Sequence, residues 1–161
     1  MKVQDVDQAL LDTVCSRLQR QLSGDEAQRA EAFVRQYYRW VSPDYLADRS
    51  ELDVYGAALA HFNLARRRAP GATRIRVYNP QFESDGWQSS HTAVEIVTDD
   101  APFLIDSISM ELNRRGFGVH LIIHPVMRVR RDEAGGLLEV LPRDTEAEHA
   151  VAESVIHAEV V

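Results

Sequence analysis

The segment from Thr98 to Pro125 constrains the fold of this chain more than any other. It encodes a strand end, a helix and a second strand with few residues between them. Asp99 and Asp100 precede the helix, where a carboxylate can accept hydrogen bonds from first-turn amides. Pro102 is placed in the first turn, where its missing N–H costs nothing. Two arginines followed by Gly116 are typical of a helix end.

One face of this helix is apolar and should lie against a sheet. The apolar residues at helical spacing are Leu104, Ile105, Ile108 and Leu112. Alternating residues over 93–97 and 119–124 predict a strand on each side of the helix. A further alternating run over 127–131, glycines within 132–136 and a second run over 137–141 predict a hairpin.

The first half of the chain is predicted to be helical. One apolar stripe comprises Val6, Leu10, Val14, Leu18 and Leu22, and the next comprises Ala30, Phe33, Val34, Tyr37 and Val41. A Ser23-x-x-Glu26 capping box should begin the second helix, and Ser50-x-x-Asp53 should cap a third. Residues 73–78 alternate like a strand that joins the sheet, and 79–90 predict a long loop between the two halves.

Length and composition limit the classes of function. A chain of 161 residues that is 45% hydrophobic can bury one core, with a helical subdomain attached. The net charge of −7 argues against nucleic-acid binding driven by bulk charge. A single cysteine excludes an internal disulfide, and no run is long and apolar enough to cross a membrane. We therefore expect a cytoplasmic protein with neither nucleic acid nor membrane as a partner.

Two histidines are the first candidates for metal ligands. On a strand, His120 and His124 would lie about 13 Å apart, too far to share one ion, so we expect no metal site. Asp99, Asp100 and Asp106 form an acidic cluster, but neither a histidine nor a nucleophile stands nearby to complete a catalytic set. We therefore expect no catalytic residues in this chain.

Two further sequence patterns bear on ligand binding. The Gly116-Phe-Gly118 pattern follows a helix and precedes a strand, the reverse of a dinucleotide site. It therefore predicts a helix cap. The arginines at 66–68, 74, 76, 128, 130 and 131 could bind an anion or an acidic partner, although such runs are usually solvated faces.

The stretch VEIVTDDAPFLIDSISMELNRRGFGVHLIIHPVMRVRRD, residues 94–132, resembles a known family. Its Asp-x-Pro-x-Leu motif, apolar helix and Gly-x-x-Val motif look like the opening β-α-β of an ACT domain, a small ferredoxin-like module that often binds amino acids and regulates metabolic enzymes. More closely, the stretch resembles the N-terminal region of the very large bacterial NAD-specific glutamate dehydrogenases. Residues 153–159 also resemble the next strand of that family, whereas the helical part before Tyr78 is far less specific.

The resemblance implies an α+β fold. A helical subdomain over 1–72 would precede an incomplete ACT-like (ferredoxin-like) β-α-β-β sheet over 73–161, truncated before its second helix and last strand. The chain would be a non-catalytic regulatory or assembly segment without a cofactor, in a parent enzyme that uses NAD to oxidise L-glutamate to 2-oxoglutarate and ammonia. The implied partners are other domains of the parent, further copies in a homo-oligomer, and an amino-acid effector in allosteric control of amino-acid catabolism.

The resemblance places a candidate effector groove at Asp99, Asp100, Pro102, Phe103 and Leu104. Phe103 stands where amino-acid-binding ACT domains usually have glycine, so we expect its ring to fill the groove. Replacing it by glycine should open the groove and lower stability through lost burial. Phe103 and Met110 are also candidates for a subunit interface.

Two alternatives and one further expectation remain open at this stage. The chain could be an amino-acid-sensing ACT module of another metabolic protein, or a protein-interaction domain that uses its arginines. Residues 154–161 look like an apolar strand still under way, which predicts a piece of a longer polypeptide. The edge of such a strand would promote self-association through Val155 to Val161.

Overall fold

The computed structural model describes residues 4–142 and 145–161, with side chains from residue 8 onward. The helices of this part are α1 (Gln4–Gln21), α2 (Gly24–Tyr37), α3 (Pro43–Ala47), α4 (Glu51–Ala65), α5 (Phe82–Asp85) and α6 (Leu104–Arg114). The strands are β1 (Arg74–Tyr78), β2 (Thr92–Asp99), β3 (Val119–Ile123), β4 (Val126–Arg131), β5 (Leu137–Val140) and β6 (Val151–Val160). Each predicted helix, strand and hairpin is confirmed.

All strands belong to one antiparallel sheet with β6 at its centre. The order is β1-β2-β6-β4-β5, and β3 pairs with β6 in line with β4. Residues of β6 pair with β2 from Glu153 to Val160, and with β3 and β4 on the other side. The expectation that Val155 to Val161 form a free edge is therefore wrong, because β6 is paired on both sides.

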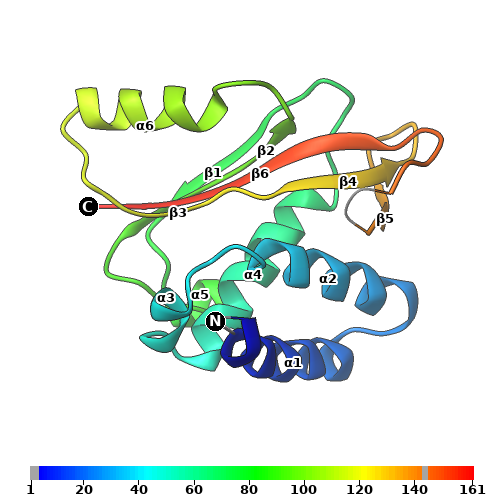
Figure 1. The fold of residues 1–161 in the computed structure, drawn as a ribbon, viewed down its shortest axis with the longest axis horizontal. Coiled ribbons are helices and arrows are strands. Elements are labelled where there is room, and N and C mark those ends of the chain that lie inside the picture. Colours follow the sequence, from blue (N-terminus) through cyan, green and yellow to red (C-terminus); the bar gives the residue numbers. More distant parts are fainter. Residues whose placement is uncertain (1–3, 143–144) are drawn as a thin grey trace.

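Helices cover the two faces of the sheet to different extents (Figure 1). α1, α2 and α4 pack beneath one face, and α6 lies alone over the other. Alternate β6 side chains face the helical layer, since Glu153 contacts Arg68 and Glu159 contacts Arg49. The mixed α+β, ACT-like architecture predicted from the sequence is thus observed.

The helices and the sheet share one hydrophobic core. Phe33 packs edge-on against Phe62, with ring centroids 5.5 Å apart, and stacks on Tyr37. Sheet residues that join the same cluster include Val97, Leu121, Ile123, Met127 and Val155. The division of the chain at residues 72 and 73 nevertheless remains a prediction.

The face beneath α6 is less covered. Leu104, Ile105, Ile108 and Leu112 form the half-buried stripe predicted for α6, but no residue of this helix is fully buried. On β1, Ile75 and Val77 are 59% and 61% exposed. Ile75 and Val77 therefore form exposed apolar surface at the β1 edge of the sheet.

The two predicted caps have different outcomes. Ser50 accepts a hydrogen bond from the backbone N–H of Asp53 at 3.1 Å, so this cap is confirmed. Ser23 is the N-cap residue of α2, but its side chain makes no capping hydrogen bond. The predicted capping box is therefore wrong. Glu26 instead forms an ion pair with Arg66, which follows α4. The side chain of Val6 lies outside the described residues.

Candidate effector groove

A groove of about 210 Å³ lies between the start of α6 and the strands beneath it. Asp100, Phe103, Leu104 and Asp106 line its helical side, and His124, Val126, Ser154 and Ile156 line its strand side. Of the predicted groove residues, the fold therefore brings Asp100, Phe103 and Leu104 together. The strand side was missed, because these residues reach the groove only through the pairing of β6.

Two hydrogen bonds hold Asp100 in place on the helical side of the groove. Its carboxylate accepts a hydrogen bond from the Ser154 hydroxyl at 2.8 Å, and its N–H donates to Ala152 O at 3.0 Å. The predicted helix-capping role of Asp99 and Asp100 is wrong, because neither is the N-cap residue of α6. Both side chains bond to groups far away in the sequence instead.

Phe103 is the N-cap residue of α6 and has a left-handed backbone conformation, with φ 65° and ψ 16°. This region suits glycine and costs other residues about 1–2 kcal/mol. The side chain lines the groove but is 74% exposed. The apolar burial on which the predicted loss of stability rested is therefore not observed, and the effect of replacement by glycine stays a prediction.

Asp99 points to the opposite face of the sheet, away from the groove. It accepts a hydrogen bond from Arg68 Nη2 at 2.8 Å, and the same guanidinium binds Glu153 at 2.7 Å. Arg131 also binds Glu153, through Nε at 2.7 Å and Nη2 at 2.8 Å. Two arginines thus share one buried carboxylate directly behind the groove, because Glu153 and Ser154 are neighbours in β6.

The remaining predicted residues lie around the groove. Pro102 precedes the N-cap and is not among the lining residues, so its predicted position in the first turn is wrong. Met110, a predicted interface residue, is 71% exposed on α6. His124 lines the groove, whereas His120 stacks on His91 with ring centroids 4.1 Å apart.

A buried polar network joins α2 and α4 to the sheet. His61 bonds to the Tyr37 hydroxyl at 3.1 Å and to Ile96 O at 3.0 Å. Burial, together with nearby His157, lowers the pKa of His61 to about 3. His61 is therefore neutral at physiological pH.

A second part of this network surrounds Glu159. Its carboxylate binds Arg49 at 2.8 Å and His157 at 2.9 Å. Burial alone would raise the pKa of Glu159, but the hydrogen bonds from His157 and Arg49 outweigh it and lower the pKa to about 2. Glu159 is therefore a buried carboxylate that stays charged.

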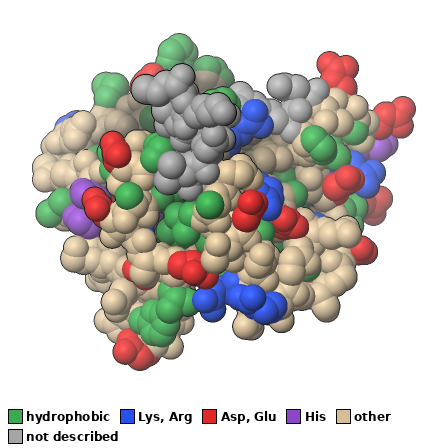
Figure 2. All heavy atoms as spheres, turned by 60° about the horizontal axis from the view of Figure 1, so that its bottom comes forward, with side chains coloured by type: hydrophobic (Ala, Val, Ile, Leu, Met, Phe, Trp, Pro, Cys, Tyr) green, Lys and Arg blue, Asp and Glu red, His purple; other side chains and the backbone are tan. Residues whose placement is uncertain are grey.

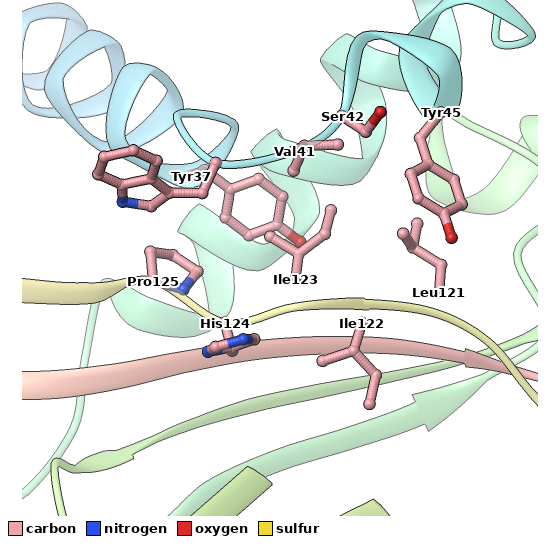
Figure 3. A pocket seen from close by; sticks show the side chains of 10 residues that line it. Tyr37, Val41, Ser42, Tyr45, Leu121, Ile122, Ile123, His124 and Pro125 are labelled. Atoms are coloured by element: carbon pink, nitrogen blue, oxygen red, sulfur yellow. The ribbon is translucent and has the colours of Figure 1, made fainter.

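A separate pocket of about 290 Å³, which we call the apolar edge pocket, opens beside β3 (Figure 3). Its upper wall comes from Tyr37 of α2, from Val41 and Ser42 between α2 and α3, and from Tyr45 of α3. Its floor comes from residues 121–125, and Trp40 also lines the pocket. This pocket could not be predicted from the sequence, because it forms only where the α2–α3 connection lies against a strand 80 residues later.

The charged side chains on the face shown in Figure 2 are interspersed, with acidic and basic groups side by side. Several of the predicted anion-binding arginines are engaged in ion pairs, namely Arg66 with Glu26, Arg76 with Asp85 and Arg130 with Glu139. Among the described residues, no group of three or more His, Cys, Asp or Glu side chains is arranged to hold a metal ion. No described helix is long and apolar enough to cross a membrane.

The fold is that of an ACT-like module: an antiparallel sheet has one helix, α6, on one of its faces, and a groove lies at the start of that helix. The chain belongs to the family described as "Glutamate dehydrogenase, ACT1 domain", whose model matches residues 33–161. This confirms the predicted resemblance.

Three relatives of this chain carry the same name. NAD-specific glutamate dehydrogenase of Halomonas elongata is 42% identical over 152 residues, which are 94% of this chain and 9% of the relative. The Pseudomonas aeruginosa enzyme of that name is 40% identical over 138 residues, 85% of this chain and 8% of the relative. The Mycobacterium tuberculosis enzyme is 30% identical over 98 residues, 61% of this chain and 6% of the relative. The chain thus spans less than a tenth of the relatives it matches most fully. No solved structure matches it significantly.

Proposed function

We propose that this chain is a non-catalytic regulatory and assembly segment of an NAD-dependent glutamate dehydrogenase. The parent would convert L-glutamate, NAD and water to 2-oxoglutarate, ammonia and NADH, with NAD bound in another domain. Family membership and the names of the relatives support this proposal. We further propose that the parent is a cytoplasmic homo-oligomer in which the exposed side chains of Phe103 and Met110 contact a neighbouring subunit.

The regulatory role would be exercised by an amino acid bound in the groove. The carboxylate of Asp100, held in place by Ser154, can accept hydrogen bonds from the ligand's ammonium group. The first-turn amides of α6 have no partner within the helix and can donate to the ligand's carboxylate. Ile156 and Val126 provide apolar contact for a side chain. The single observation that carries this proposal is the open groove at the start of α6.

Calorimetric titration of the chain with a panel of amino acids tests the proposal. We expect saturable binding of at least one of them, weakened at least tenfold in Asp100→Asn, because a charged acceptor for the ammonium group is lost. Asp25→Asn, which changes an exposed carboxylate in the first turn of α2, is the matched control and should leave binding unchanged. Failure of every amino acid to bind would remove the effector role and leave only assembly.

The non-catalytic part of the proposal has its own test. Titration with NAD should give no saturable binding, because no strand-glycine-helix phosphate cradle is present in the described residues. Saturable NAD binding at micromolar concentration would refute this part. The first alternative function, an amino-acid-sensing module of another metabolic protein, would use the same groove. The acidic-partner domain loses support because the arginines named above are already in ion pairs.

A further inference from the structure

β3 is an edge strand along its whole length. It pairs with β6 on one side, while β5 pairs only with β4, at Val129 to Arg131. No described strand pairs with the other side of β3. A pocket lies directly beside β3.

The hydrogen-bonding groups on this edge follow from the register. Val155 N–H donates to Pro125 O at 3.0 Å, and Ile123 faces His157 in the same register. Bonded pairs alternate in an antiparallel ladder, so the bonded residues on this side are 121, 123 and 125. The N–H and C=O groups of Ile122 and His124 therefore point away from β6, toward the open edge.

The apolar edge pocket lies beside these groups (Figure 3). Leu121 and Ile123, both buried, belong to its floor, and Val41 and Tyr45 to its upper wall. A strand added to β3 would run about 4.8 Å from it, with alternate side chains directed to the helical side. One of these side chains would enter the apolar edge pocket.

A second pocket continues the first along β3. We call it the acidic edge pocket. It has a volume of about 440 Å³, shares Tyr45 with the apolar edge pocket and reaches His120. Its carboxylates belong to Asp44, Asp48, Asp53 and Glu159, and its one guanidinium, that of Arg49, is neutralised by Glu159. Asp53 is engaged by the N–H of Gln88, whereas Asp44 and Asp48 are exposed. The pocket therefore suits a cation.

We propose that the open edge of β3 binds an extended segment of a partner protein. The segment adds to β3 as a further strand and places an apolar side chain in the apolar edge pocket. Two residues along, about 6.8 Å away, a lysine or arginine lies against Asp44 and Asp48. The recognised pattern is thus an apolar and a basic residue separated by one position.

The test is an NMR titration of the 161-residue chain with acetyl-Thr-Lys-Thr-Leu-Thr-Lys-Thr-amide. This peptide reads the same in both directions, so either strand orientation presents one lysine to the acidic edge pocket. We expect shifts at the amides of Ile122 and His124, together with slower hydrogen exchange there. Changing leucine to aspartate, or both lysines to glutamate, should weaken binding at least about fivefold.

Two matched comparisons separate strand addition from general attraction. N-methylation of one alternate set of peptide amides should abolish binding, whereas methylation of the other set should leave it unchanged. Asp44→Lys should weaken binding about fivefold. Asp25→Lys is the matched control and should not change binding, because Asp25 is an exposed second residue of α2, as Asp44 is of α3.

Three results would overturn the proposal. The first is equal affinity for the glutamate peptide, and the second is a set of shifts confined to the groove of α6. The third is protection of Ile122 and His124 by self-association without peptide, because a second copy would then occupy the edge.

Discussion

Arg68 and Glu153 form a buried ion pair, with 2.7 Å between Nη2 and Oε2 and both side chains almost fully shielded from solvent. Arg68 follows α4 and Glu153 belongs to β6, so the pair joins the helical layer to the central strand. The backbone N–H of Arg68 also donates to Gly135 O in the β4–β5 turn at 2.9 Å, and the nearby Arg66 O accepts a hydrogen bond from the N–H of Leu137.

Glu153→Gln should lower the free energy of unfolding by about 3 kcal/mol, because it leaves the buried Arg131 guanidinium without a carboxylate and leaves Arg68 with only the more exposed carboxylate of Asp99. Urea unfolding measures the change. Glu139→Gln is the control, since it breaks the exposed pair with Arg130 and should cost less than about 1 kcal/mol. Similar costs for the two variants would show that the Arg68–Glu153–Arg131 cluster contributes no special stability.

The stability of the chain should fall as the pH is lowered. The pKa of His61 is about 3 in the fold and about 6.5 in the unfolded chain, so between these values only the unfolded chain binds the proton. The loss from this residue approaches about 1.4 kcal/mol per pH unit. Glu159, with a pKa of about 2, adds a loss in the same direction between about pH 4.5 and 2.

His61→Gln isolates the first contribution. Glu95, whose pKa burial raises, acts in the opposite direction but is common to both proteins, so it cancels when their curves are subtracted. The variant is expected to be less stable, with a flatter pH dependence between 6.5 and 5. Parallel curves for the two proteins would mean that His61 does not titrate on unfolding in this range.

Phe103→Gly should leave stability unchanged or raise it by up to about 1 kcal/mol, because glycine adopts the left-handed conformation without strain. Met110→Gly is the matched comparison, since Met110 is equally exposed but lies inside α6, where glycine costs about 1 kcal/mol. Thermal unfolding of both variants decides the sign. A loss from Phe103→Gly as large as that from Met110→Gly would argue against backbone strain at Phe103.

Gly56→Ala should destabilise the chain by about 2 kcal/mol. An added Cβ would meet the carbonyl oxygen of Gly86 and lie 2.7 Å from Trp87 Cβ, and neither can move as a flexible side chain would. Gly118→Ala places its Cβ 3.6 Å from Val161 Cγ2, which is ordinary contact, and should change stability by less than about 0.5 kcal/mol. Chemical denaturation of both variants provides the comparison.

The sequence predicted features that depend on near neighbours in the chain. The half-buried stripe of α6 and the Ser50 cap follow from helical spacing and from a donor three residues away. The helical side of the groove was placed correctly for the same reason, because Asp100, Phe103 and Leu104 lie within five residues of one another.

Features that depend on distant partners could not be predicted in this way. Arg68 and Glu153 are 85 residues apart, and their pairing follows from the register of the whole sheet. The left-handed conformation of Phe103 arises where the chain leaves β2, with Asp100 tied to Ser154, and turns into α6. The sequence pattern of Asp99 and Asp100 therefore resembles a local helix cap, although both carboxylates bind groups that are distant in the sequence.

The central position of β6 has a consequence for synthesis of the chain on the ribosome. β2 and β3 do not pair with each other, so both strands can emerge while the space between them is still empty. Only when residues 151–160 leave the exit tunnel can the two parts of the sheet join, and these residues complete the core on the helical side as well. A nascent chain arrested before residue 151 should thus remain a target for chaperones, whereas one released after residue 160 can complete the sheet.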